Sequence, residues 1–172
     1  MAVTSNIKDI TNRIKKHIDA NKPVLLTLMS ADTIAFSVER FQQQNWKDTT
    51  IEPWKARKNY GDNSTRKTLM KSGALWRSIH LASIGSNYFV ISSNMKYSKI
   101  HNDGGTINVP VTDKMRKFAW AKYYGTKNPF YKNLATTQKQ SLSITMPRRR
   151  FLGESNYLVQ ILKKRILTQL LK

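Results

Sequence analysis

The sequence predicts an α+β fold with helices at both ends of the chain and a mostly antiparallel β-sheet of about four strands between them. Apolar residues recur at helical spacing near both ends, whereas polar and apolar residues alternate in the middle. Glycine-rich turns separate the alternating stretches. At 172 residues the chain is long enough for one domain with its own core. We therefore expect a single domain over residues 1–172.

The first 44 residues are predicted to form a helical hairpin that packs on the sheet. Four isoleucines share one face of the first helix, namely Ile7, Ile10, Ile14 and Ile18. Asn21 is a suitable end for this helix, and Pro23 suits the first turn of the next one, because proline lacks the N–H that an interior position needs. The second helix should then extend to about Gln43.

The segment from Gln42 to Arg66 is polar and irregular, and it contains Trp46 and Trp54. Two interpretations are open. Either the tryptophans anchor this loop to the body of the domain, or they are exposed contacts for a partner, since aromatic residues are enriched at interfaces.

Residues 72–153 are expected to form the sheet. Residues 76–84 and 88–93 predict a hairpin around the turn Gly85-Ser86-Asn87. Residues 106–110 and 141–146 predict an extended ribbon that begins at a turn formed by Gly104 and Gly105, because paired glycines accept positive φ.

A helical insertion at residues 111–139 separates the two arms of the ribbon. Thr112 is the expected N-cap of its helix and Gly125 the expected end. A loop or a second short helix follows from residue 128. The last predicted element is a C-terminal helix over residues 154–172, whose apolar residues can face the sheet.

The charge balance limits the functions that fit this chain. Thirty Lys and Arg against ten Asp and Glu give a net charge of +20, and the excess is spread along the chain. A distributed excess in a folded domain indicates a polyanionic neighbour, such as nucleic acid, an acidic protein or a membrane surface. Alternatively, it is a solvated basic face with no specific role.

Several classes of function find no support in the sequence. The absence of cysteine excludes disulfide scaffolds, cysteine-ligated zinc and thiol nucleophiles. No membrane-spanning segment or signal peptide is predicted. His101 and Asp103 suggest a metal-dependent nuclease, but Asp103 and Asp113 are the only acids between residues 63 and 153. Since such enzymes need several converging ligands, we expect no catalytic, cofactor or metal site.

The candidate contact residues combine cations with aromatic rings, as a platform for nucleic acid would. They are Arg116, Lys117, Trp120, Lys122, Tyr123 and Tyr124 in the insertion, followed by Arg148, Arg149 and Arg150. The same insertion could instead be an arm that packs on a neighbouring subunit. Because no DNA-reading motif is evident, any contact with nucleic acid should be with phosphate rather than bases.

Several motifs in one order resemble the phage virion morphogenesis family of Mu-like tail-completion proteins. They are Trp46 with Pro53-Trp54, Lys71 to Ile79, Ile84 to Asn87, Tyr97 to Gly105, and Pro147 to Gly153. The sequence departs from the family pattern at Lys99, at Arg149-Arg150 and in the long basic insertion.

This resemblance implies a non-enzymatic structural protein of a tailed bacteriophage or prophage, acting in tail completion or head–tail joining. It implies assembly in the bacterial host cytoplasm and a place in the virion, at the head–tail junction or tail. The implied partners are phage neck and tail proteins (connector, tail tube or terminator), packaged DNA through non-specific contact, and further copies of the chain in a ring, a hexamer or dodecamer. A structural role follows for six motif residues, His101, Gly104, Gly105, Pro147, Phe151 and Gly153, with His101 hydrogen-bonded to the glycine turn. The alternative from another class is a basic, non-catalytic DNA-binding accessory protein.

Overall fold

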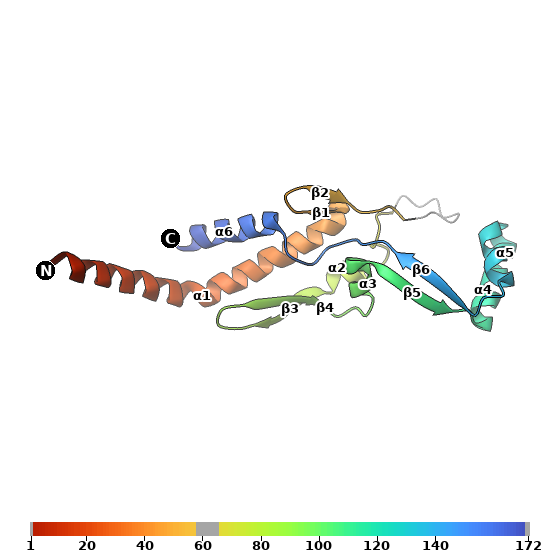
Figure 1. The fold of residues 1–172 in the computed structure, drawn as a ribbon, viewed down its shortest axis with the longest axis horizontal. Helices are drawn as coiled ribbons and strands as arrows, with labels where there is room; N and C mark the ends of the chain where they lie inside the picture. The colour runs from red at the N-terminus through yellow and green to blue at the C-terminus, as the bar shows by residue number, and fades with distance from the viewer. Residues whose placement is uncertain (1, 58–65, 171–172) are drawn as a thin grey trace.

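The computed structural model describes residues 2–57 and 66–170 and has an elongated shape (Figure 1). Its helices are α1 (Ala2–Gln43), α2 (Ala74–Arg77), α3 (Ser98–Asp103), α4 (Asp113–Thr126), α5 (Pro129–Thr136) and α6 (Asn156–Leu170). Its strands are β1 (Asn45–Lys47), β2 (Ile51–Pro53), β3 (Ile79–Ile84), β4 (Phe89–Ser93), β5 (Gly105–Pro110) and β6 (Ser141–Met146). The predicted α+β class is confirmed. The last two residues of the predicted C-terminal helix lie outside the described residues.

The predicted N-terminal helical hairpin is wrong, because the structure has one helix, α1, of 42 residues with Pro23 inside it. An interior proline removes one backbone hydrogen bond and favours a bend, but it does not require a reversal of the chain. The helix bends part-way along its length (Figure 1). Its C-terminal half packs on α6 and on the β3–β4 hairpin, whereas residues 7–20 are exposed throughout.

The strands form three separate two-stranded antiparallel sheets, β1–β2, β3–β4 and β5–β6, instead of the predicted single sheet of about four strands. The predicted hairpin and ribbon are both present. The hairpin starts at Ile79 because Gly73, at φ 72°, allows the one-turn helix α2 to form over the first residues of the predicted strand. The ribbon pairs all six residues of each strand without a bulge, from Gly105 with Met146 to Pro110 with Ser141.

The core lies between α1 and the segments that cross it. Its main cluster contains Phe41, Trp54, Leu75, Ile79 and Phe151. A second cluster joins Phe36 on α1 to Trp46 and to Leu158 on α6. Trp46 and Trp54 are both buried, so the interpretation of the tryptophans as anchors is confirmed.

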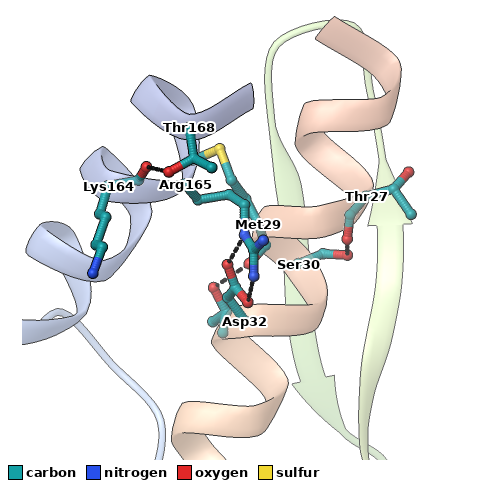
Figure 2. A network of polar contacts seen from close by, with 8 residues as sticks. Thr27, Met29, Ser30, Asp32, Lys164, Arg165 and Thr168 are labelled. Carbon is teal, nitrogen blue, oxygen red and sulfur yellow. Dashed lines mark hydrogen bonds and ion pairs between the residues drawn. The ribbon is translucent and has the colours of Figure 1, made fainter. Parts of the chain in front are cut away.

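Helix α6 is fixed to α1 by an ion pair as well as by apolar packing. Arg165 donates from Nε and Nη2 to the two carboxylate oxygens of Asp32 at 2.7 and 2.8 Å (Figure 2). The hydrogen bond with Asp32, together with the carboxylate charge, raises the pKa of Arg165. This two-pronged contact fixes the position of α6 along α1.

Candidate functional site

The two sequence motifs at the ends of the ribbon meet in space at its root. The side-chain oxygen of Asn102, at the end of α3, accepts hydrogen bonds from the backbone N–H groups of Phe151 and Leu152, both at 2.9 Å. The carbonyl of His101 accepts from the backbone N–H of Arg149 at 2.8 Å. We call this set of contacts the root clamp. It joins residues almost fifty positions apart and sets the direction in which the ribbon leaves the core.

Glycine is required at the root because two backbones approach closely there. Gly104 has φ 74°, and a Cβ on it would lie 2.9 Å from the backbone nitrogen of Arg148. Gly105 has φ 132°. The predicted glycine turn is therefore confirmed, and at Gly104 a side chain would be excluded by sterics as well as by conformation.

The other motif residues lie around the same junction. Phe151 is fully buried against Phe41, with ring centroids 4.9 Å apart. Gly153 has φ 141°, which allows the chain to turn toward α6. Pro147 is half-buried between β6 and the arginines.

The three consecutive arginines, here called the arginine segment (Arg148–Arg150), have different surroundings. Arg149 is buried and donates from Nε to the carbonyl of Lys55 at 2.9 Å. Arg150 donates to the carbonyl of Glu154 at 2.9 Å and covers the Trp46 ring at 4.5 Å from its centroid. Arg148 is exposed, and its side chain makes no hydrogen bond with any residue that the structure describes. Of the three, Arg148 is therefore the most exposed.

His101 is packed inside the root clamp. Its ring lies edge-on to Tyr97, with centroids 5.9 Å apart, and its Nδ1 is buried without a hydrogen-bond partner among the described residues. Burial lowers the pKa of His101, and the charge of Arg149 lowers it further. The expected hydrogen bond from His101 to the glycine turn is wrong, because the backbone N–H of Gly104 donates to the carbonyl of Ile100 and the His101 carbonyl accepts from the N–H of Arg149.

The part of the chain that the structure describes brings no three His, Asp or Glu side chains together as a metal site would. Asp103 instead accepts a hydrogen bond from the Asn102 side chain at 2.7 Å.

At its far end the ribbon carries α4 and α5, which we call the helical tip (residues 112–137; Figure 1). Thr112 caps α4 by accepting from the backbone N–H of Met115, as predicted. Ala119 on α4 and Ala135 on α5 are both buried. Their small side chains allow the two helices to pack closely. Helix α4 does not end at Gly125, as predicted, but continues to Thr126. The residue that follows, Lys127, has the left-handed backbone conformation that ends the helix.

Arg116 has an internal role in the helical tip. Its guanidinium donates to the carbonyls of Ala135 and Thr137 at 3.2 and 2.5 Å. These are backbone acceptors at the end of α5 that lack helical partners, so Arg116 caps α5 and fixes it to α4.

The remaining candidates of the tip form an aromatic surface bordered by lysines. Trp120 stacks on Tyr124 with ring centroids 5.8 Å apart and planes 24° apart. Lys127 Nζ lies 5.6 Å from the Tyr124 centroid. Tyr123 packs edge-on to Trp120, while Lys117 and Lys122 are exposed. All six predicted tip residues thus lie on α4, and about 20 Å of ribbon separates this helix from the arginine segment.

Asn102 is the residue that the sequence interpretation missed, although it lies inside one of the motifs. In that motif, His101 and the pair Gly104 and Gly105 are the more familiar signals of a functional residue and of a turn. An Asn in the last turn of a short helix, two residues before a glycine pair, is itself a signal for a side chain that accepts backbone N–H groups.

Among the described residues, no helix is long and apolar enough to cross a membrane.

Comparison with known proteins gives one match that covers nearly the whole chain. The model of the phage virion morphogenesis family matches residues 2–171. No curated protein and no solved structure gives a significant match. The match includes the root clamp, the ribbon and the helical tip, and the family acts in the assembly of phage particles. The chain therefore belongs to the phage virion morphogenesis family.

Proposed function

We propose that this chain is a structural subunit that acts in tail completion or head–tail joining during virion assembly, as part of an oligomeric ring at the neck or tail end. The observation that carries the proposal is the surface area of the single chain. The chain exposes 12351 Å², whereas a compact monomer of 19.9 kDa exposes about 8,700 Å² by the scaling of surface with mass. The difference, about 3,700 Å², is in the range that permanent assemblies bury.

The exposed surface includes apolar side chains at both ends of the molecule. Large hydrophobic residues that are more than one-third exposed occur on α1, on the β3–β4 hairpin, on α4 and on α6. Exposed apolar surface on this scale is typical of a protein that works within an assembly. Neighbouring copies and other neck or tail proteins are the proposed partners, and a hexamer or dodecamer is the proposed ring. The role is structural, without catalysis or a cofactor.

The helical tip is proposed to face packaged DNA or an acidic neighbour. Residues 111–140 hold seven Lys and Arg against one Asp. Lys117 and Lys122 are exposed on α4, the helix that carries the stacked rings of Trp120 and Tyr124. Exposed lysines contact phosphate without reading sequence, so the proposed contact with DNA is non-specific.

The assembly role is tested by removing the gene from the phage and examining the lysate by electron microscopy. We expect DNA-filled heads and tails that do not join, or tails of aberrant length, and we expect joining to be restored by the protein supplied in trans. Mass spectrometry of purified particles should find the protein. Infectious particles that form normally without it would contradict the proposal.

A basic DNA-binding accessory protein is the second candidate, and the charge of the helical tip favours it. Lys117→Glu with Lys122→Glu changes the charge at the tip, and Lys163→Glu with Lys164→Glu makes the same change on α6, where both lysines are exposed. If the tip binds DNA, only the tip variant should lose duplex affinity. Its slope of log K against log salt should become shallower by about 0.9 for each phosphate that the variant no longer neutralises. Equal losses of affinity in both variants would mean that net charge alone attracts DNA.

A further inference from the structure

The β5–β6 ribbon has two unpaired edges. Its two strands form a sheet of their own, and Figure 1 shows this sheet spanning the distance between the body of the molecule and the helical tip. A two-stranded ribbon by itself is only marginally stable in water, and further strands or a covering helix are what stabilise one. Each edge of the ribbon is therefore a place where another strand can add.

The hydrogen-bond pattern shows which backbone groups these edges offer. Just beyond the last pair of the ribbon, the backbone N–H of Val111 donates to the carbonyl of Gln140 at 2.8 Å. In an antiparallel pair, residues alternate between those whose N–H and C=O face the partner strand and those whose groups face away from it. The residues that face away, here called the outward residues, are Thr106, Asn108 and Pro110 on β5 and Ser141, Ser143 and Thr145 on β6. Elsewhere in the described part of the chain, no residue hydrogen-bonds to their backbone groups.

The ribbon lacks the features that keep edge strands from pairing. Natural proteins protect such edges with lysine, with proline or with bulges. Residues 104–112 and 140–147 contain no Lys, Arg, Asp or Glu, in a chain with thirty cations, and the pairing is free of bulges. Pro110 stands at the tip end of β5, where the N–H that it lacks would face outward. Both edges are thus open along the rest of their length.

The two faces of the ribbon differ in polarity. Ile107 pairs with Ile144, and Val109 pairs with Leu142, so these four apolar side chains share one face. The outward residues place Thr, Asn, Ser and Pro side chains on the other face. A strand that adds to an edge continues both faces only if its own residues alternate in the same way. Strands β5 and β6 of a second copy meet this requirement.

The net charge limits where a second copy can approach. Two chains of +20 repel each other, and the repulsion is weakest where both are free of charge. Residues 78–95, which include the β3–β4 hairpin, are also uncharged. That hairpin, however, has a register shift between Leu81 and Ser83 and packs on α1. The ribbon is therefore the uncharged strand pair whose edges suit another copy.

We propose that the β6 edge of one copy pairs antiparallel with the β5 edge of the next copy, so that their ribbons form one continuous sheet. The inference rests on the proposed function, because it names the contact between neighbouring ring subunits. Outward residues such as Ser143 and Asn108 of the next copy would exchange the N–H···O bonds that they lack in the single chain. The apolar faces of neighbouring ribbons would then join into one.

The choice of β5 as the partner of β6 follows from the symmetry of a ring. Copies related by rotation about an axis that runs along the ribbons carry their ribbons in the same direction. In that arrangement β6 of one copy lies beside β5 of the next, and the two strands run antiparallel because β5 and β6 do so within each ribbon. Pairing of β6 with β6 would need a two-fold axis instead. A closed ring leaves no ribbon edge free.

Disulfide formation between single-cysteine variants tests which edges meet, because the chain has no cysteine of its own. The Asn108→Cys chain is co-expressed with a chain that carries Ser141→Cys, Ser143→Cys or Thr145→Cys, which covers staggers of two residues in either direction, and the purified protein is oxidised. At least one combination should give a disulfide-linked dimer on a non-reducing gel, because opposed Cα atoms lie about 5.5 Å apart, within the range of a disulfide. Ile144→Cys is the matched control on β6, because its side chain lies on the opposite face.

Each cysteine variant expressed alone should give no dimer, since its cysteine then lies beside an unmodified strand. Dimers from Ser143→Cys alone would show two-fold pairing of β6 with β6 and would overturn the proposal. The same conclusion follows if Ile144→Cys gives as much dimer as the outward positions, or if no combination gives any.

Proline substitution tests the backbone bonds separately from the side chains. Asn108→Pro and Ser143→Pro each remove an outward N–H, place a ring on one edge and leave the bonds within the ribbon in place. Each variant alone should have the mass of one 19.9 kDa chain by light scattering. An equimolar mixture should form a one-to-one dimer, because one intact β6 edge and one intact β5 edge remain. Asn108→Ala and Ser143→Ala keep the N–H and should oligomerise like the wild type.

A proline variant that oligomerises like the wild type, or a wild-type chain that is monomeric in the same buffer, would refute this contact. The cysteine combinations decide the question if a proline variant fails to fold. The assembly role is judged separately. If the Asn108→Pro phage still joins heads to tails while the null phage does not, the proposed function stands and this contact fails.

Discussion

Replacing Asn102 by Ala should destabilise the chain by removing the acceptor at the centre of the root clamp. Its side-chain oxygen accepts from two backbone N–H groups at 2.9 Å each. Phe151 is fully buried, so its donor would be left without water or protein partner, at a cost of about 1–3 kcal/mol. The Leu152 donor is less enclosed and adds a smaller cost. Together they predict a loss of about 3 kcal/mol in the free energy of unfolding.

Urea denaturation and thermal unfolding at fixed protein concentration measure this loss. For a chain of this length 1 kcal/mol corresponds to about 2–4 °C, so Tm should fall by about 6–12 °C. Asp103→Ala is the matched control, because it removes the exposed hydrogen bond to the Asn102 amide nitrogen and leaves the clamp in place. An Asn102→Ala protein that is no less stable than Asp103→Ala would refute the assignment of the clamp to this oxygen.

Four further results are expected. Gly104→Ala should destabilise the protein by about 1–3 kcal/mol, because φ is 74° and the added methyl would meet backbone. Gly125→Ala should stabilise the protein by about 0.5–1 kcal/mol, because Gly125 lies in a helix and an added Cβ would have no atom within 4 Å. Chemical denaturation of the two glycine variants compares these effects. The pKa of His101 is lowered in the folded state, so the unfolded chain binds more protons, and stability should fall as pH drops below 6.5. His101→Gln should flatten that pH dependence in a series of melts, and an unchanged slope would assign it to other groups. Asp32→Asn should loosen α6 from α1, seen as faster amide exchange in α6 with little effect on the helical tip, and loss of protection in both would contradict a local role.

Local patterns in the sequence predicted those elements whose stability is local. The alternation in residues 106–110 and 141–146 predicted the ribbon, and Thr112 predicted the start of α4, because a side-chain cap depends only on residues within one turn. The glycine pair indicated positive φ without any knowledge of long-range contacts.

The errors have a common physical cause, which is that packing decides between locally similar outcomes. Pro23 suits the first turn of a helix but is also tolerated inside one, and nothing near it in sequence shows that α1 continues. Alternation identifies strands but not their neighbours, so the sequence predicts one sheet where the structure has three. The sequence suggests that Arg116 and Arg149 are free to bind a partner. In the structure, both guanidinium groups instead donate hydrogen bonds to backbone carbonyls that are distant in sequence.

The regular pairing of β5 with β6 makes the body and the tip separable modules. Every residue of both strands is paired, and beyond them the backbone N–H of Val111 still donates to the carbonyl of Gln140. Residues 112–139 can therefore be exchanged for a two-residue turn without changing the register below. Under the proposed role of the tip as a contact surface, its sequence can change with the partner while the ribbon that carries it keeps its pairing.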